Sequence, residues 1–94
     1  MNRIDIKAAF SLSGRGYVIA GDITEGTIKK GMFVNYPFGS ATSKIKIEAV
    51  EFLDGLEGKA ISYPALVLSQ KSVDELNIAN EKSWLGKVYD CTET

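Results

Sequence analysis

A chain of 94 residues with 45% apolar and 24% charged side chains predicts one folded domain over residues 1–94, because it is too short for two domains and too apolar for a disordered chain. Its first ten residues interleave charged with apolar side chains, and no apolar run approaches the roughly 18 residues of a membrane helix. We therefore expect no secretory signal and no membrane helix, and a cytoplasmic protein. With no histidine and a single cysteine, Cys91, the chain excludes internal disulfides and histidine-based triads or zinc sites.

The net charge of −1 is unevenly distributed along the chain. Residues 1–47 contain seven basic and three acidic residues, a balance of +4, and residues 48–94 contain four basic and nine acidic residues, a balance of −5. A basic half attracts polyanions such as RNA, whereas charges that mix once the chain folds give an ordinary solvated surface. Both interpretations stay open at this point.

The first predicted element is a strand over residues 4–12. Its even-numbered residues are apolar and alternate with mostly polar odd-numbered residues, a pattern typical of a half-buried strand. The residues predicted to face inward are Ile4, Ile6, Ala8, Phe10 and Leu12.

Glycine recurs every fifth residue from Gly16 to Gly31 in the stretch GRGYVIAGDITEGTIKKG. This spacing gives three G-x-x-x-x-G frames, but none is followed by the Lys-Ser/Thr pair that a phosphate-binding loop needs. Ile19 stands where a dinucleotide-binding G-x-G-x-x-G would have its third glycine. We therefore expect that the chain binds no nucleotide and no other cofactor.

The same glycines bound short runs of β-forming residues, a pattern that favours strands joined by tight turns and bulges. Gly14 and Gly16 are predicted to turn the chain after the first strand, and Gly26 to turn it again, with positive φ among these three positions. Gly31 is predicted either to bend a third strand or to let another backbone approach closely. This strand is predicted to continue through residues 32–36 and to end at Pro37.

A loop over residues 37–43 and a fourth strand over residues 44–52 are predicted next. Ile45, Ile47 and Ala49 are expected to face inward at the start of this strand. The apolar phase then shifts to Val50 and Phe52, which indicates a bulge, and residues 54–58 predict a turn.

The remaining chain predicts two more strands and one helical turn. Residues 60–69 form a strand in which Pro64 places the early part at an edge or bulge. The Ser72-x-x-Glu75 spacing of a capping box predicts a helical turn through Leu76, and residues 84–89 predict a last strand. About six short strands with almost no helix predict an all-β fold, a small closed six-stranded β-barrel with one short helical turn.

The segment FSLSGRGYVIAGDITEGTIKKGMFV, residues 10–34, resembles the second-domain β-barrel of elongation factor Tu and related translational GTPases. The family pattern is roughly F-S-I-x-G-R-G-T-V-V-x-G-x-I-x-x-G-x-I-K-x-G-D-x-V, with Met32 here in place of its aspartate, and a looser likeness extends over residues 4–89. The resemblance implies a translation-protein-like barrel as a stand-alone domain, without the GTPase domain that drives the family's cycle. It also implies a binding module that contacts RNA, the ribosome or a translation component, although a shared fold does not carry a function with it.

Outward-facing lysines supply the candidate polyanion site. If Ile28, Ile45 and Ile47 face inward, the neighbouring lysines on the third and fourth strands face outward. Adjoining strands would then form a patch suited to phosphate contact and base stacking, made of Lys29, Lys44, Lys46, Tyr36 and Phe38. The alternative for the two aromatic residues is that they close one end of the barrel core.

No catalytic residues are expected, because Cys91 has no histidine to activate it and the serines and threonines have no adjacent base. No metal site is expected either, since residues 54–58 lack the regularly spaced ligands of a calcium loop. Two functions remain. One is a non-catalytic module that binds RNA or a translation-related protein. The other is a protein-interaction barrel that binds a partner, or forms a homo-oligomer, through an edge strand such as the one containing Pro64.

Overall fold

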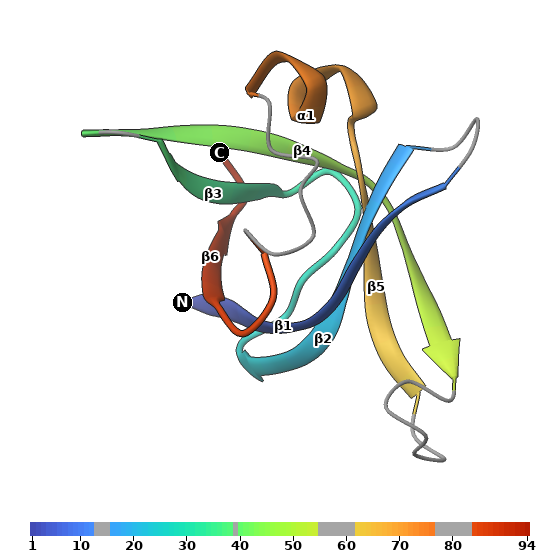
Figure 1. Ribbon diagram of the computed structural model, residues 1–94. Helices are drawn as coiled ribbons and strands as arrows, with labels where there is room; N and C mark the ends of the chain where they lie inside the picture. Colours follow the sequence, from blue (N-terminus) through green and yellow to red (C-terminus); the bar gives the residue numbers. More distant parts are fainter. Residues whose placement is uncertain (13–15, 39, 55–61, 77–83) are drawn as a thin grey trace.

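The computed structural model describes residues 1–12, 16–38, 40–54, 62–76 and 84–94. These residues contain six strands and one helix (Figure 1). In chain order they are β1 (Asn2–Leu12), β2 (Gly16–Glu25), β3 (Phe33–Phe38), β4 (Ala41–Asp54), β5 (Ser62–Leu68), α1 (Gln70–Leu76) and β6 (Val88–Thr92). The strands close into a barrel in the order β1-β2-β5-β4-β3-β6, with every pair antiparallel. The predicted all-β fold, a closed six-stranded barrel with one short helix, is confirmed.

β6 closes the barrel by pairing with two strands that are distant from it in sequence. Its residues 88–91 pair with Asn2–Asp5 of β1, and its last two residues pair with the first two residues of β3. The last strand was predicted over residues 84–89, but Trp84–Gly86 form a turn and the strand begins only at Val88. That prediction is therefore wrong in its bounds.

Aromatic rings fill the interior of the barrel. Trp84 is fully buried, and its ring centroid lies 4.9 Å from that of Tyr36, 5.0 Å from that of Tyr89 and 6.1 Å from that of Tyr17. Tilted ring pairs at these separations are favourable. Rings of this size suit a small barrel, whose interior is filled by side chains.

A bulge reverses the two faces of β1 midway along the strand. Ile4 and Ile6 lie in the main core as predicted, and the register against β2 shifts between Ile6 and Ala8. Beyond this shift Ala9 lies in the main core, whereas Ala8 and Phe10 pack on the opposite face of the sheet. The prediction that even positions face inward is therefore wrong at Ala8 and Phe10, because one extra residue exchanges the two faces, and the side chain of Leu12 lies outside the described part of the structure.

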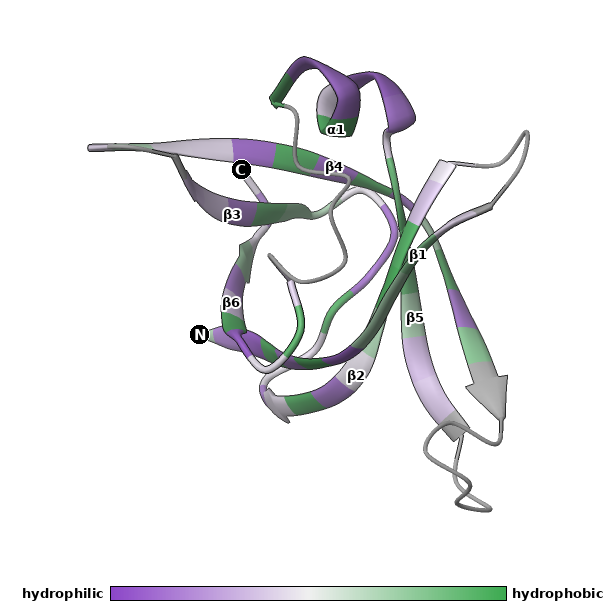
Figure 2. Ribbon diagram, viewed as in Figure 1, coloured by the Kyte–Doolittle hydropathy of each residue, from purple (hydrophilic) through white to green (hydrophobic). Residues whose placement is uncertain are grey.

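The bulge predicted in β4 is confirmed. Ile45 and Ile47 are fully buried, the register against β5 shifts between Ile47 and Ala49, and Val50 packs against the main core (Figure 2 shows the hydropathy along the strand). Ala49 was expected to face inward, but it packs with a second apolar cluster on the other face of the sheet, formed by Val18, Ala20, Ala65 and Val67. Phe52 is 69% exposed, since it lies on the end of β4 that only β5 accompanies.

β3 and β4 form a tight hairpin where a loop over residues 37–43 was predicted. Pro37 lies inside β3 opposite Thr42, and β4 begins at Ala41. The expectation that the third strand ends at Pro37 is wrong. β6 pairs only with the first two residues of β3, and a proline is tolerated where one side of a strand has no partner.

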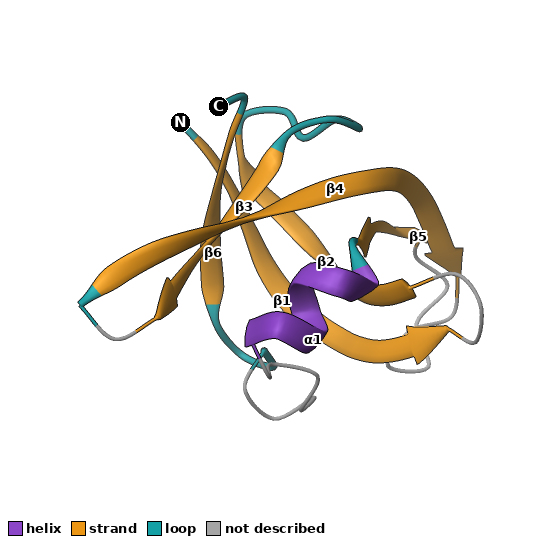
Figure 3. Cartoon of the chain, turned by 90° about the horizontal axis from the view of Figure 1, so that it is seen from above, coloured by secondary structure: helices purple, strands orange, loops and turns teal. Residues whose placement is uncertain are grey.

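Ser69 caps α1, not Ser72 as the sequence spacing predicted. The Ser69 Oγ accepts a hydrogen bond from the Ser72 N–H at 3.4 Å, and the Ser69 C=O accepts one from the Val73 N–H at 3.1 Å. These are the two bonds of an N-cap residue, so Ser72 lies inside the helix. Val73 of α1 is fully buried. Figure 3, which views the molecule from above, shows α1 lying across the strands of the barrel.

Positive φ angles confirm two of the predicted glycine turns and relocate a third. Gly16 has a φ of 117° and Gly26 a φ of 73°, whereas Gly14 lies outside the described residues. Gly31, with a φ of 92°, lies in the turn before β3 and does not bend the strand. Another backbone does approach it, because its N–H donates to the Ile47 C=O at 2.9 Å.

Pro64 lies on an unpaired side of β5, as its position in the sequence predicted. β5 pairs with β4 along its whole length but with β2 only from Ala65 to Leu68. The turn predicted over residues 54–58 falls almost entirely outside the described residues.

Candidate nucleic-acid interface

The outer face of the β3–β4 hairpin presents two of the predicted lysines side by side. Lys44 and Lys46 are exposed, and they alternate along β4 with Ile45 and Ile47, which are fully buried. The expected adjacency of the third and fourth strands is confirmed, because β3 pairs with β4 from Ala41 to Lys46. Two lysines two residues apart on one strand point to the same side of the sheet.

Phe33 is the aromatic residue that shares this face with the lysines. It lies directly opposite Lys46 in the β3–β4 register and is half-buried. Residues directly opposite in an antiparallel pair have their Cβ atoms only about 5 Å apart, so the ring and the lysine stem are neighbours. The sequence prediction chose Tyr36 and Phe38 instead. Inside–outside alternation along the strand, with the apolar Val34 facing inward, was the signal that could have identified Phe33 as an outward-facing residue.

Tyr36 belongs to the barrel core and not to the outer face. It is 9% exposed, and its ring stacks on that of Tyr89 at a centroid distance of 5.7 Å and lies against Trp84. Its predicted role in stacking on a base is therefore wrong, because the ring would have to leave the core. The alternative expectation, that Tyr36 closes one end of the barrel core, agrees with the structure in so far as the ring belongs to the core.

Phe38 and Lys29 occupy the ends of the proposed patch. Phe38 is the last residue of β3, opposite Ala41, and its side chain lies outside the described part of the structure. Lys29 is exposed and Ile28 is buried, as predicted, but Lys29 lies in the connection between β2 and β3 and not in a strand.

Backbone hydrogen bonds fix this connection to β4 beside the lysines. The Gly31 N–H donates to the Ile47 C=O at 2.9 Å, and the Ile47 N–H donates to the Met32 C=O at 2.8 Å. The turn that contains Lys29 is therefore attached to β4 one residue after Lys46. Lys30, which the sequence prediction did not include, is also exposed in this turn.

A chain of polar contacts crosses the face toward the end of β6. The Lys44 Nζ donates to the Thr94 C=O, and the Thr92 hydroxyl donates to the same oxygen at 2.8 Å. The Asn35 Nδ2 donates to the Thr92 Oγ1 at 3.5 Å, while the buried Asn35 Oδ1 accepts no hydrogen bond within the described residues. Lys44 is thus held near the C-terminal residues, and Lys46 is free of them.

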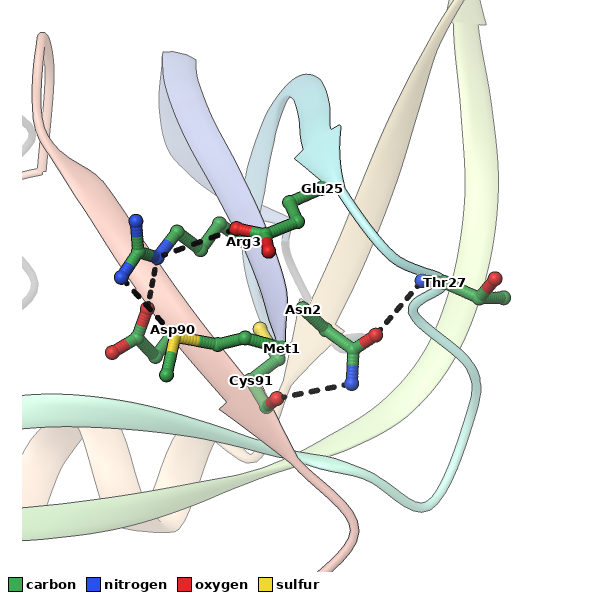
Figure 4. Close-up of polar contacts among 7 residues, drawn as sticks. All are labelled: Met1, Asn2, Arg3, Glu25, Thr27, Asp90 and Cys91. Carbon is green, nitrogen blue, oxygen red and sulfur yellow. Dashed lines mark hydrogen bonds and ion pairs between the residues drawn. The ribbon is translucent and has the colours of Figure 1, made fainter.

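Arg3, another cation of the basic half, is neutralised by carboxylates. Its Nε lies 2.9 Å from the Asp90 Oδ1 and 3.9 Å from a Glu25 oxygen, on neighbouring strands (Figure 4). Within the part of the chain that the structure describes, Lys46 has no carboxylate oxygen within 4.0 Å. Among the described residues of the basic half, Lys7 pairs with Asp5 at 3.3 Å, and the lysines without a carboxylate oxygen within 4.0 Å are those of the β3–β4 hairpin and of the turn before it, Lys29, Lys30, Lys44 and Lys46.

The candidate interface is an open face of the sheet. Over residues 1–12, 16–38, 40–54, 62–76 and 84–94 there is no group of three metal-ligating side chains and no enclosed pocket. None of the helices described is long and apolar enough to cross a membrane. The chemistry available on this face is phosphate contact by lysine and stacking by Phe33.

Comparisons with protein-family models, with curated proteins and with solved structures return no match to this chain.

Proposed function

We propose that the chain is a non-catalytic binding module that contacts single-stranded RNA through the outer face of the β3–β4 hairpin. The observation that carries the proposal is the pairing of Phe33 with Lys46 across the hairpin, next to the exposed Lys44. Lysines that track phosphates beside an aromatic ring that stacks on bases are the combination found in proteins that bind single strands without sequence preference.

Two further features support an RNA ligand. Lys29 lies in a turn that is hydrogen-bonded to β4, which widens the basic surface beyond the hairpin. The segment over residues 10–34 resembles the barrel of translational GTPases, proteins whose barrels contact RNA. The proposed ligand, RNA, and the proposed role in translation both rest on the basic surface together with this resemblance. The proposal requires no catalytic step.

Reversing the charge of Lys44 and Lys46 together to glutamate tests the interface. Single-stranded RNA binding, measured by fluorescence anisotropy of a labelled oligouridine at low salt, should be weak in the parent protein and lost in the double variant. Three lysine–phosphate contacts predict a log–log salt slope of only about −2. The melting temperature should stay within a few degrees because both side chains are exposed.

The matched control reverses two exposed lysines elsewhere, Lys71→Glu with Lys87→Glu, and makes the same change in net charge. This control should retain more of the RNA affinity than the Lys44→Glu, Lys46→Glu variant. Phe33→Leu should weaken binding about five-fold or more, because one stacked base contributes about 1–3 kcal/mol. Equal loss in both double variants, or binding that ignores salt, contradicts a specific face on the hairpin.

A further inference from the structure

The outer face of β6, β3 and β4 places Lys44 near the residues that end β6. Lys44 lies directly opposite Asn35 in the β3–β4 register, and Thr92, the last residue of β6, lies opposite Phe33 on the other side of β3. Side chains two residues apart on a strand point to the same side of the sheet, so Phe33 and Asn35 share one face. On this face β3 therefore lies between Thr92 and Lys44.

The Thr94 C=O joins the two sides of β3. It accepts hydrogen bonds from the Lys44 Nζ and from the Thr92 hydroxyl, the latter at 2.8 Å, while the Asn35 Nδ2 donates to the Thr92 Oγ1 at 3.5 Å. Residues 93 and 94 are exposed and follow the end of β6, so the sheet itself does not fix them. The chain thus holds an oxygen acceptor of its own against a lysine of the proposed RNA-binding face.

The Thr94 C=O and an RNA phosphate use the same donor. Both accept a hydrogen bond from a lysine ammonium, but only the phosphate is charged, and hydrogen bonds between two ionised groups are the stronger ones. A group tethered by a few residues competes at an effective concentration on the order of millimolar. Lys46, on the same face, makes no contact of this kind with residues 92–94.

We infer that residues 92–94 act as an internal competitor for RNA on the outer face of the β3–β4 hairpin. In the free protein the Thr94 C=O occupies the Lys44 Nζ, and the Thr92 hydroxyl positions that oxygen. A backbone phosphate of the bound RNA strand displaces it. This inference rests on the proposed function, because it names the contact that the RNA must break. Lys44 should therefore contribute less to RNA affinity than Lys46, although both are exposed.

Thr92→Val tests the competition, because it removes the hydroxyl that positions the Thr94 oxygen and keeps a β-branched side chain that suits a strand. Binding of labelled oligouridine at low salt, measured by fluorescence anisotropy, should become about three-fold tighter, as expected for the loss of one exposed competing contact. Thr42→Val is the matched control and should leave the affinity unchanged. Thr42 is exposed two residues from Lys44 on β4 and takes no part in these hydrogen bonds.

Alanine substitutions of Lys44 and Lys46 in both backgrounds separate competition from a general effect on the face. Lys44→Ala should cost more RNA affinity in the Thr92→Val protein than in the parent, because only there is the ammonium available without breaking its contact. Lys46→Ala should cost the same in both backgrounds. The melting temperatures should stay within a few degrees of the parent, because none of these side chains is buried.

The contact between Lys44 and Thr94 is measured separately, without RNA. In the isotope-labelled parent protein, ¹⁵N relaxation should show the backbone amides of residues 93 and 94 restrained on the picosecond–nanosecond timescale. Lys44→Ala should make both amides mobile. Oligouridine added to the parent should release the same two residues.

Three results would overturn the inference. They are equal RNA affinity of the Thr92→Val and parent proteins, an equal cost of Lys44→Ala in both backgrounds, and residues 93 and 94 that are already mobile in the free parent. Each of these leaves the proposed function standing when the parent binds oligouridine. Absence of RNA binding by both the parent and the Thr92→Val protein would instead overturn the proposed function, and with it the competition, even where Lys44 restrains residues 93 and 94.

Discussion

Single glycines with similar backbone angles have different surroundings in this barrel. Gly26 and Gly31 both have positive φ, but a Cβ on Gly26 would lie 2.1 Å from the Asn2 Oδ1 and 2.6 Å from the Met1 C=O, whereas a Cβ on Gly31 would meet nothing within 4 Å. The Asn2 side chain accepts a hydrogen bond from the Thr27 N–H at 2.9 Å, which ties the start of β1 to the turn after β2 (Figure 4).

Gly26→Ala should therefore destabilise the protein more than Gly31→Ala. We expect about 1 kcal/mol for Gly31→Ala from backbone strain alone and about 2–3 kcal/mol for Gly26→Ala, where a steric clash adds to the strain. Thermal unfolding followed by circular dichroism measures both, at about 4–8 °C per kcal/mol for a domain of this size. Equal melting temperatures for the two variants would contradict the close contact at Gly26.

At the scale of elements, the short helix α1 depends on the residue before it. Ser69 follows β5 directly, so its position is set by the end of the strand, and it makes both N-cap hydrogen bonds. The capping-box spacing of Ser72 and Glu75 placed the helix start too late because the same residue types favour both N-caps and first turns.

Ser69→Ala should lower the free energy of unfolding by about 1 kcal/mol, the usual loss for an N-cap serine. Ser72→Ala is the matched control and should cost a few tenths of a kcal/mol at most, because alanine is a better helix former than serine. Urea unfolding monitored by the fluorescence of the buried Trp84 compares the two. A larger loss for Ser72→Ala would restore the original capping-box interpretation.

For the whole molecule, the closing strand β6 links the stability of the barrel to alkaline pH. Its inward residues are Tyr89 and Cys91, both almost fully buried. Burial, with a smaller effect of the Asp90 charge, raises the pKa of Cys91 from 9.0 to about 12. Burial, with a smaller effect of Tyr36, raises the pKa of Tyr89 from 10.0 to about 12. Both groups stay neutral in the folded barrel at pH values where they ionise in the unfolded chain.

The contribution of Cys91 and Tyr89 to the free energy of unfolding should therefore be constant below about pH 9 and fall as the pH rises toward about 12. The sign follows because the folded state holds more protons than the unfolded state across this window. Cys91→Ala should remove the fall between about pH 9 and pH 10 and make it roughly half as steep between about pH 10 and pH 12, where Tyr89 alone then contributes. Urea unfolding at a series of pH values gives both profiles, and identical profiles would contradict a buried neutral thiol.

Local patterns in the sequence were enough to predict the fold class and part of the candidate site. The alternation around Ile45 and Ile47 predicted which lysines of β4 face outward, because side chains on a strand have a period of two. The glycines predicted turns, two of which are confirmed at Gly16 and Gly26, because glycine adopts positive φ at little cost. The likeness to the translational GTPase barrel and the RNA ligand stay predictions.

The sequence by itself therefore determined most of the strand-forming segments, the turns at Gly16 and Gly26, and the inward side of the strands up to their bulges, since these depend on neighbours in the chain. Only the tertiary structure decided that β5 lies between β2 and β4, that a bulge moves Ala8 to the outer face, and that Tyr36 is buried and Phe33 is not. It also decided that β4 pairs with β3 at one end and with β5 at the other. These features depend on how strands distant in sequence pair when the barrel closes, and a pattern with a period of two defines the faces of a strand but not its neighbours.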